Sequence, residues 1–325
     1  MWLHRKYKMI KDYVQNIIAI SLIRGVGSAF MKNHRAMLLN YKDNTDLLTN
    51  IGGKVTLEEF NKNISTAKAI IDNCLQNDIE IITIADDWYP KLLIEIKNPP
   101  PIIFYKGNLE NIKMPIALIG TRKATDLGNR IGEKVTEYFH KDYSICNGLA
   151  EGIDKSTIQP KGKTIERAVG VLSGGLNLPK SLTKKNAKLA ESVLDNNGLL
   201  ISEFEPNKKE DSFSSIKACR IQAGLSKCLI LIQSPKDGGS KYTIKSFSEV
   251  DRPLGIINFS GNKEYDLTEI FSANRMIVSN GIQGIAEIGD IKKLNNIRTK
   301  SIIPISSSKD YEIIKEKIKT VANNA

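Results

Sequence analysis

The chain has 325 residues, with 47 Lys and Arg against 36 Asp and Glu, which gives a formal net charge of +11. That length suggests two domains, and a hydrophobic share of 41% excludes a disordered chain. The apolar run Ile17–Ile23 is too short to span a membrane, and no signal peptide follows the basic start. We therefore expect a cytoplasmic protein without membrane contact.

The four cysteines form no Cys-x-x-Cys pair, and the chain has only three histidines, so we expect no metal site and no cofactor. The positive charge indicates a polyanionic partner. A second explanation stays open, because joint enrichment in Lys, Asn and Ile is typical of an A+T-rich genome. The position of the charges has to decide between the two.

Residues 1–78 predict an N-terminal helical domain of the SAM or helix-hairpin-helix type. Apolar residues recur at helical spacing, for example at Ile64, Ala67 and Ile71. The segment Gly25-Val26-Gly27 lies between two such stretches. A turn of this kind can present backbone N–H groups to a phosphate, or it can be a tight turn between helices without a ligand.

Residues 79–111 predict an extended connector that leads into the core. Two short strand-like runs, 79–85 and 102–107, flank Pro99-Pro100-Pro101. Each proline fixes its own φ and biases the preceding residue towards an extended conformation.

Residues 112–291 predict a Rossmann-like α/β domain, because short apolar runs alternate with amphipathic helices. This rhythm indicates a doubly wound, mainly parallel sheet with helices on both faces. The expected strands are 116–119, 144–146, 169–172, 199–202, 229–232 and 254–258. Residues 292–325 remain as a basic tail with a short helix over 311–321.

Ligands bind such sheets outside the carboxyl ends of the strands, so the loops there are the candidate site. Glycine lets a backbone approach a phosphate closely, the following helix offers free N–H groups, and Arg or Lys adds charge. No loop matches Gly-x-Gly-x-x-Gly or the P-loop. The predicted phosphate-binding residues are Gly120, Thr121, Arg122, Lys123, Gly148, Gly152, Gly174, Gly175, Gly238, Gly239, Ser240 and Lys241.

Lys217 and Arg220 share one face of an expected helix. They are either a solvated charged face or part of a basic trough long enough for a polynucleotide backbone. Groups for catalysis are sparse, since the loops hold no histidine, and Glu151 and Asp154 fit the start of a helix. The sequence therefore predicts a binding protein and not an enzyme.

Several motifs, in this order, resemble the DNA-processing protein A family (DprA, also called Smf). They are Asp87-Trp88-Tyr89-Pro90-Lys91-Leu92, Asn98-Pro99-Pro100-Pro101, Ile119-Gly120-Thr121-Arg122, Asn147-Gly148-Leu149-Ala150-Glu151-Gly152-Ile153-Asp154, Ser202-Glu203-Phe204, Arg220-Ile221-Gln222-Ala223-Gly224-Leu225-Ser226, Gly238-Gly239-Ser240 and Asn274-Arg275-Met276-Ile277. The resemblance covers roughly residues 10–291.

The resemblance implies a cytoplasmic, non-enzymatic protein that binds and protects incoming single-stranded DNA in natural transformation and helps to load the RecA recombinase. It also implies a homodimer through the Rossmann-like domain, with Arg122, Lys217 and Arg220 at the DNA. The family's Phe-Pro-x-Arg-Asn-Arg segment is changed here, with Ala218 and Cys219 in place of an arginine and the asparagine. We expect no winged-helix domain after residue 291.

The alternative function is a small-nucleotide sensor or an enzyme that resembles the phosphoribohydrolases on a related Rossmann-like fold. Those enzymes carry Pro-Gly-Gly-x-Gly-Thr-x-x-Glu. In the comparable segment of this chain, Tyr242 and Lys245 stand in place of the threonine and the catalytic glutamate.

Overall fold

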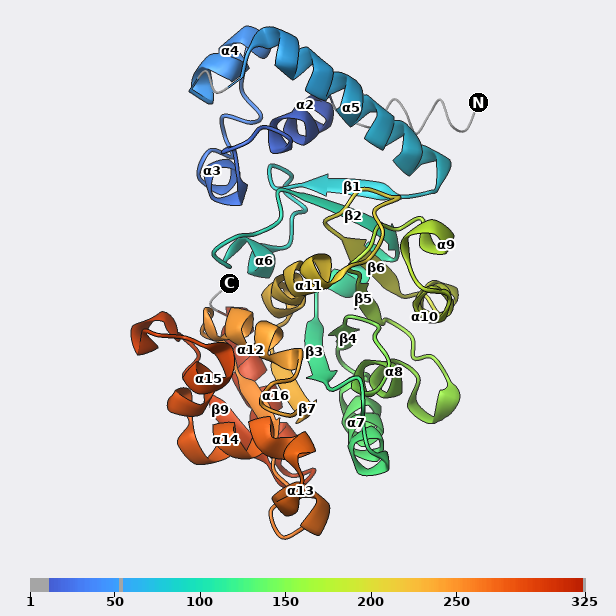
Figure 1. Ribbon diagram of the computed structural model, residues 1–325, viewed down its shortest axis with the longest axis vertical. Helices are drawn as coiled ribbons and strands as arrows, with labels where there is room; N and C mark the ends of the chain where they lie inside the picture. The colour runs from blue at the N-terminus through green and yellow to red at the C-terminus, as the bar shows by residue number, and fades with distance from the viewer. Residues whose placement is uncertain (1–11, 53–54, 324–325) are drawn as a thin grey trace.

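The computed structural model describes residues 12–52 and 55–323, and within them nine strands form one mixed sheet flanked by helices (Figure 1). This confirms the predicted α/β class. The first eleven residues of the expected N-terminal domain lie outside the described residues. The strands are β1 Glu80–Thr83, β2 Ile102–Gly107, β3 Pro115–Gly120, β4 Ser144–Asn147, β5 Val169–Val171, β6 Leu199–Ser202, β7 Leu229–Gln233, β8 Leu254–Ile257 and β9 Ile302–Ile305.

The strand order is β1-β2-β6-β5-β4-β3-β7-β8-β9. Strands β3 to β9 run parallel, whereas β1 and β2 join antiparallel at one edge. Strands β3 and β7 are neighbours although three strands separate them in the chain, so the order reverses between them. Every residue of β4, β6, β7 and β8 is buried, as expected for parallel strands covered on both faces.

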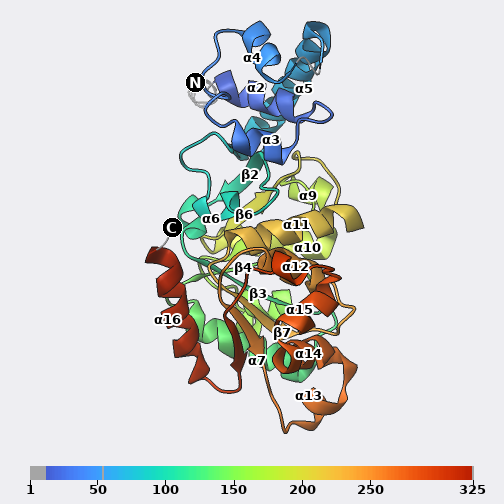
Figure 2. The same cartoon turned by 90° about the vertical axis from the view of Figure 1, so that its left-hand side faces the viewer.

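Helices cover both faces of the sheet (Figures 1 and 2). On one face, α11 packs against α12, and α12 against α15. On the other face, α7 packs against α8. The helices are α2 Asp12–Ser21, α3 Ser28–Asn33, α4 Asn44–Asn50, α5 Leu57–Gln76, α6 Lys91–Ile94, α7 Asp126–Phe139, α8 Ile153–Ile158, α9 Leu178–Ser181, α10 Lys184–Asp195, α11 Ser212–Leu225, α12 Ser240–Ser248, α13 Lys263–Leu267, α14 Ser272–Asn280, α15 Ile282–Gly289 and α16 Asp310–Asn323, with short 3-10 turns η1 Leu109–Ile112, η2 Pro160–Gly162, η3 Glu269–Phe271 and η4 Leu294–Asn296.

The sheet is wider than the sequence predicts, because it takes in strands on both sides of residues 112–291. The two runs expected in the connector are β1 and β2, and β2 pairs with β6. In the expected basic tail, β9 pairs with β8, and α16 packs on α7 with the rings of Tyr138 and Tyr311 4.8 Å apart. The four-residue β9 contains Pro304, whose backbone nitrogen faces away from β8 and costs the ladder no hydrogen bond. The domain boundaries themselves remain a prediction.

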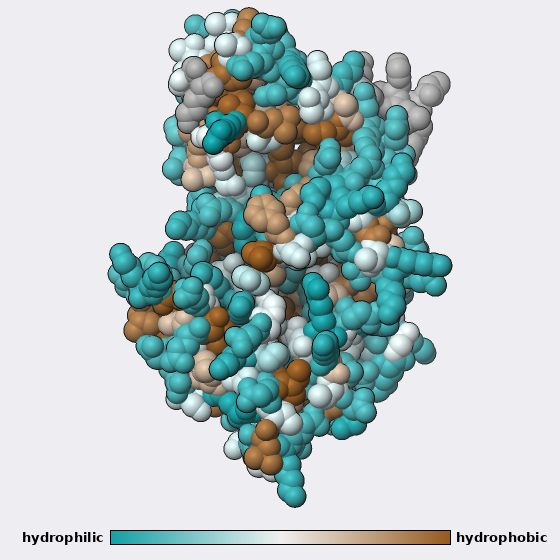
Figure 3. Space-filling model, in the orientation of Figure 1, coloured by the Kyte–Doolittle hydropathy of each residue, from teal (hydrophilic) through white to brown (hydrophobic). Residues whose placement is uncertain are grey.

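The N-terminal helices sit above the β1 edge (Figures 1 and 2). Helix α5 begins with a capping box between Thr56 and Glu59. Lys32 donates to the carbonyl of Ile96 at 3.2 Å, which ties the helices to the connector. In the space-filling view, hydrophobic surface gathers where these helices meet the β1–β2 segment (Figure 3). The Gly25–Gly27 turn connects α2 to α3, and its contact with a phosphate remains a prediction.

Within residues 12–52 and 55–323, no helix has the length and apolar character needed to cross a membrane.

Candidate nucleic-acid interface

The loops that follow β3 and β7 meet where the strand order reverses. The Thr121 N–H donates to the carbonyl of Gln233 at 2.7 Å. The Gln233 side chain accepts from the Thr125 N–H at 3.0 Å and donates to its hydroxyl at 2.8 Å. In doubly wound folds the ligand crevice lies at this switch point. The sheet therefore places Gly120 and the residues after it at the position where a ligand is expected.

Arg122 is exposed, and within the described part of the chain its side chain has no hydrogen-bond or ion-pair partner. The backbone next to Arg122 is fixed, because the Ile153 N–H donates to the Thr121 carbonyl at 3.1 Å. Gly152, at a φ of +81°, lies so close that a Cβ there would stand 2.6 Å from the Arg122 carbonyl oxygen. Lys123 is exposed next to it. The loop thus presents a fixed backbone with an unpaired guanidinium.

The loop between β4 and α8 is organised by the carboxylate of Asp154. Its Oδ2 accepts from the N–H groups of Gly148 at 3.0 Å and Ala150 at 3.3 Å. Asn147 donates to the Asp154 carbonyl at 3.1 Å and accepts from the Leu149 N–H at 3.0 Å. Asp154 therefore shapes the loop that supports Arg122, a role more specific than the helix-start position that the sequence suggested.

Burial raises the pKa of Asp154 to about 7, against the opposing effects of its two N–H donors and of the nearby Arg122 charge. Burial also raises the pKa of the Cys219 thiol. The charge of Asp154 adds to this increase, and the charge of Arg122 opposes it. Cys219 lies on α11, so this helix approaches the Arg122 loop. A protonated thiol here is a poor nucleophile.

Gly174 and Gly175 are buried and serve close packing. A Cβ on Gly175 would stand 2.0 Å from the Glu205 carbonyl oxygen, and one on Gly174 would stand 2.7 Å from the carbonyl oxygen of Ser181. The Gly175 N–H donates to the Lys208 carbonyl at 2.8 Å. The structure therefore places these two glycines under the 203–208 loop and not at an open surface.

The loop between β7 and α12 is held by the start of α14. Asn274 accepts from the Ser234 N–H at 3.0 Å and donates to the carbonyls of Leu231, Ile232 and Ile257. In the same loop, Gly239 is exposed, Ser240 is buried, and Gly238 and Lys241 are half-buried. The Lys241 ammonium lies 5.5 Å from the centre of the Tyr242 ring.

Lys217 belongs to a group of side chains that sequence reasoning found only in part. Its ammonium lies 4.9 Å from the ring centre of Phe213 and 5.9 Å from that of Phe204. We call Phe204, Phe213 and Lys217 the aromatic–lysine cluster. Phe213 is 67% exposed, which is unusual for a phenyl ring. The sequence offered one signal for the missed aromatics: each stands four residues before a lysine, Phe204 before Lys208 and Phe213 before Lys217.

Arg220 lies behind this cluster with its donors occupied. It pairs with both carboxylate oxygens of Glu203, at 2.7 and 2.6 Å. It also donates to the carbonyl of Asn98 at 2.9 Å and to that of Lys217 at 2.7 Å. Arg220 is therefore an ion-paired cation, whereas Arg122 has no ion-pair partner among the described residues.

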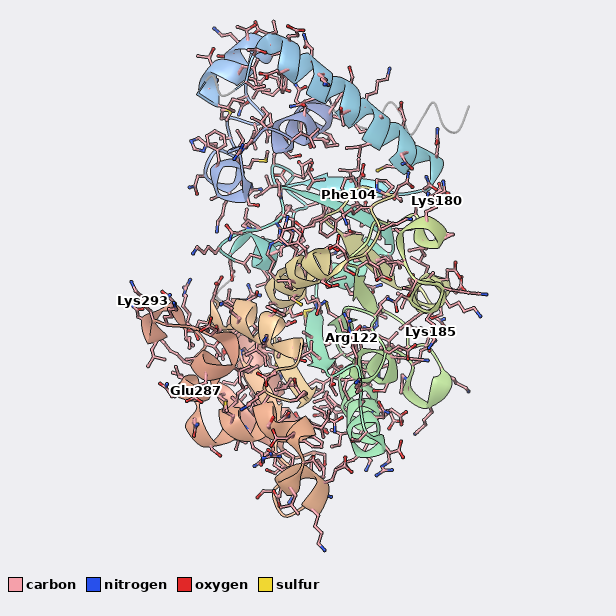
Figure 4. The ribbon with its side chains drawn as sticks, viewed as in Figure 1. Phe104, Arg122, Lys180, Lys185, Glu287 and Lys293 are labelled. Carbon is pink, nitrogen blue, oxygen red and sulfur yellow. The ribbon has the colours of Figure 1, made fainter. Side chains whose placement is uncertain are left out.

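A groove of about 350 Å³ continues from the β4–α8 loop along α10. Its walls carry lysines from α8 and α10, and Lys155 pairs with Glu151, which also lines the groove, at 3.7 Å. Figure 4 shows Arg122 towards the middle of the molecule, with Lys185 and Lys180 on the α9–α10 side and Glu287 and Lys293 on the opposite side. The basic lining residues are Lys155, Lys185 and Lys188.

A larger hollow of about 480 Å³ lies at the opposite edge, between α7 and the loop before β5. Glu137 and Glu166 stand among its basic lining residues, and Arg167 is used to donate to the His140 and Lys141 carbonyls. This mixed lining suits an anion less well than the Arg122 edge does. Among the described residues, no group of three His, Cys, Asp or Glu side chains is placed to hold a metal.

The fold and site define a doubly wound α/β protein with basic, glycine-rich loops at its switch point. Residues 80–294 match the protein-family model of DNA recombination-mediator protein A. The chain belongs to this family. It is 29% identical over 242 residues to Protein Smf of Synechocystis, covering 70% of this chain and 59% of that one. It is 34% identical over 177 residues to DNA processing protein DprA of Streptococcus pneumoniae, covering 53% and 60%.

The chain spans between 54% and 64% of the length of the curated relatives it matches. In three dimensions it resembles the X-ray structure of the Streptococcus pneumoniae DprA, with a TM-score of 0.69, 23% identity, and coverage of 94% of this chain and 98% of that one. The DprA of Helicobacter pylori, solved to study its single-stranded DNA binding mode, matches with a TM-score of 0.55, 18% identity and coverage of 76% and 96%. These two likenesses support the fold.

Proposed function

We propose that this protein binds the backbone of single-stranded DNA across the carboxyl edge of its sheet. The observation that carries the proposal is the exposed Arg122, which has no partner among the described side chains and stands on a fixed backbone at the switch point. An unpaired guanidinium is suited to a phosphate, with which it can form two charge-assisted hydrogen bonds.

The surroundings of Arg122 extend this site in two directions. Towards α10, the groove with Lys155, Lys185 and Lys188 supplies further positive charge, with Glu151 also among its lining residues. Towards α11, the aromatic–lysine cluster offers an exposed phenyl ring beside a cation. Phosphate contacts combined with base stacking are typical of proteins that bind single strands without reading sequence.

Family membership supports the same ligand. We propose in addition that the protein protects bound single strands, assists loading of a RecA recombinase, and acts in the cytoplasm as a homodimer through its Rossmann-like domain. The proposed DNA contacts are Arg122, Lys123, Lys217 and Lys241, with the glycines of the three open loops allowing close approach. Gly174, Gly175 and Arg220 are left out of direct contact, because they are committed to packing and to Glu203. We propose no catalytic step.

Fluorescence anisotropy with labelled oligo-dT tests the proposal. We expect affinity to fall as salt rises, by about 0.7 in the slope of log affinity against log salt for each phosphate neutralised. The Arg122→Ala, Lys217→Ala double variant should lose binding. Affinity that ignores salt, or that survives this double change, contradicts the proposed site. Light scattering with and without oligo-dT measures the assembly state in the same samples.

A further inference from the structure

We infer that Arg220, paired with Glu203, is a positioning residue that holds the aromatic–lysine cluster in shape and does not itself contact phosphate. The inference rests on the proposed function, since it concerns how this chain presents the cluster to a single strand. It reassigns a cation that the sequence placed at the DNA.

The guanidinium of Arg220 joins three segments of the chain. Its two terminal nitrogens bind the Glu203 carboxylate in a bidentate pair at 2.7 and 2.6 Å. Its Nε donates to the Asn98 carbonyl in the connector, and one terminal nitrogen also donates to the carbonyl of Lys217. The geometry of a bidentate pair fixes direction as well as distance.

These three segments carry or border the whole cluster. Glu203 directly precedes Phe204, which lies in the loop after β6. Lys217 is one helical turn before Arg220 on α11, and Phe213 is one further turn back. The pair of Arg220 and Glu203 therefore clamps the loop that carries Phe204 against the helix that carries Lys217. Between the side chains of Phe204 and Lys217 themselves, the described contact is a cation–ring contact, which is weak.

The exposure and charge of Arg220 argue against direct phosphate contact. Its side chain is 19% exposed and that of Glu203 is 10% exposed, so a phosphate would have to approach a carboxylate to reach the guanidinium. A pair removed this far from water is costly to break, because one charge would remain without its partner. Arg122, with an exposed side chain and no described partner, has no such obstacle.

Two variants separate positioning from direct contact, because the two roles predict opposite results. Glu203→Gln removes a negative charge and loosens Arg220. A phosphate-contacting Arg220 would then bind oligo-dT more tightly, whereas a positioning pair would bind it about tenfold more weakly, the order expected for losing one stacked base. Arg220→Lys keeps the charge but cannot form the bidentate pair. Direct contact predicts affinity near wild type, and positioning predicts the same weakening as for Glu203→Gln.

Three further measurements separate positioning from simple damage to the fold. Thermal melts followed by circular dichroism confirm that each variant is folded, and Arg220→Lys decides alone if Glu203→Gln is not. The salt slope should fall by at most about 0.7, because Lys217 is the one proposed phosphate contact within the cluster. Photo-cross-linking of an oligonucleotide containing 5-bromodeoxyuridine to Phe204 or Phe213 should fall, which unfolding of a distant region would not cause.

Binding by Glu203→Gln that equals or exceeds wild type, or a normal affinity for Arg220→Lys, overturns the positioning role while leaving the proposed function intact. Failure of the wild-type protein to bind oligo-dT overturns the proposed function and this inference with it.

Discussion

Two arginines in this molecule stand in opposite surroundings. Arg122, at the switch point between β3 and β7, is exposed and has no partner within the described residues. Arg252, in the loop before β8, is 2% exposed. Its guanidinium donates to the carbonyls of Gly224 and Ser226 at the end of α11 and of Leu92 in α6, and it pairs with Glu95 at 2.7 Å.

The difference separates a cation that holds the fold from one that we propose as a ligand contact. Arg252 closes the carboxyl end of α11, where unpaired carbonyls and the helix dipole favour positive charge. It also fastens the α6 segment of the connector to the core. The Arg122 side chain makes no such contact within the described residues. Its backbone is nevertheless fixed by the hydrogen bonds of Thr121 and by the close approach of Gly152. A fixed backbone with an exposed, unpaired charge is the pattern on which the proposed binding edge rests.

The largest effect is expected at the structural arginine. Arg252→Met leaves the α11 and α6 carbonyls and the Glu95 carboxylate without their donor, so we expect a loss of about 3–5 kcal/mol in the free energy of unfolding. Urea unfolding measures it. Oligo-dT affinity, measured well below the melting temperature, should change little. If Arg252→Met is as stable as wild type, Arg252 does not have the structural role that distinguishes it from Arg122.

A smaller loss is expected where the fold supports the binding edge. Asn274→Ala removes the acceptor of the Ser234 N–H and the donor to three strand-end carbonyls, which should cost about 1–3 kcal/mol. Asn258→Ala is the matched control, because the Asn258 side chain makes one peripheral bond, to the Ser306 hydroxyl at 3.3 Å. Equal stabilities for the two variants would show that Asn274 does not hold the β7–α12 loop.

The third prediction concerns pH. The pKa of Asp154 is about 7 in the folded protein and near 3.8 when unfolded, so the folded state binds the extra proton between these values. The contribution of Asp154 to stability is therefore largest below about pH 4, falls as pH rises, and stays low above about pH 7. Asp154→Asn should gain stability relative to wild type across that window. If the free energy of unfolding changes with pH in the same way for wild type and Asp154→Asn, the raised pKa of the buried Asp154 carboxyl is contradicted.

The sequence predicts much of the core because buried parallel strands leave a local signature. Runs such as 229–232 are apolar throughout, and β7 covers that run. Arg122 could be predicted as a candidate for a related reason. Ligands bind doubly wound sheets outside the carboxyl ends of the strands, and Arg122 follows such an end. No side-chain contact has to be known in advance.

Other features depend on contacts between distant residues and leave no such signature. Strand β9 is four residues long and interrupted by Pro304, so only its pairing with β8 reveals it. The partner of Arg220 is Glu203, 17 residues away in another element, and a sequence cannot show that the pair forms. In the sequence, the Gly174-Gly175 pair looks the same as the Gly238-Gly239 pair. The loop that buries Gly174 and Gly175 begins about 30 residues later in the chain, so the sequence does not show that they are covered.

The central claim is that Arg122 contacts the DNA backbone, and the salt dependence of oligo-dT binding tests it most directly. The comparison is between Arg122→Ala and Lys141→Ala, which removes the same charge from an exposed side chain before β4, at the opposite edge of the sheet. We expect Arg122→Ala to bind more weakly with a slope smaller by about 0.7, and Lys141→Ala to match wild type. Identical slopes and affinities for the two variants would contradict the account.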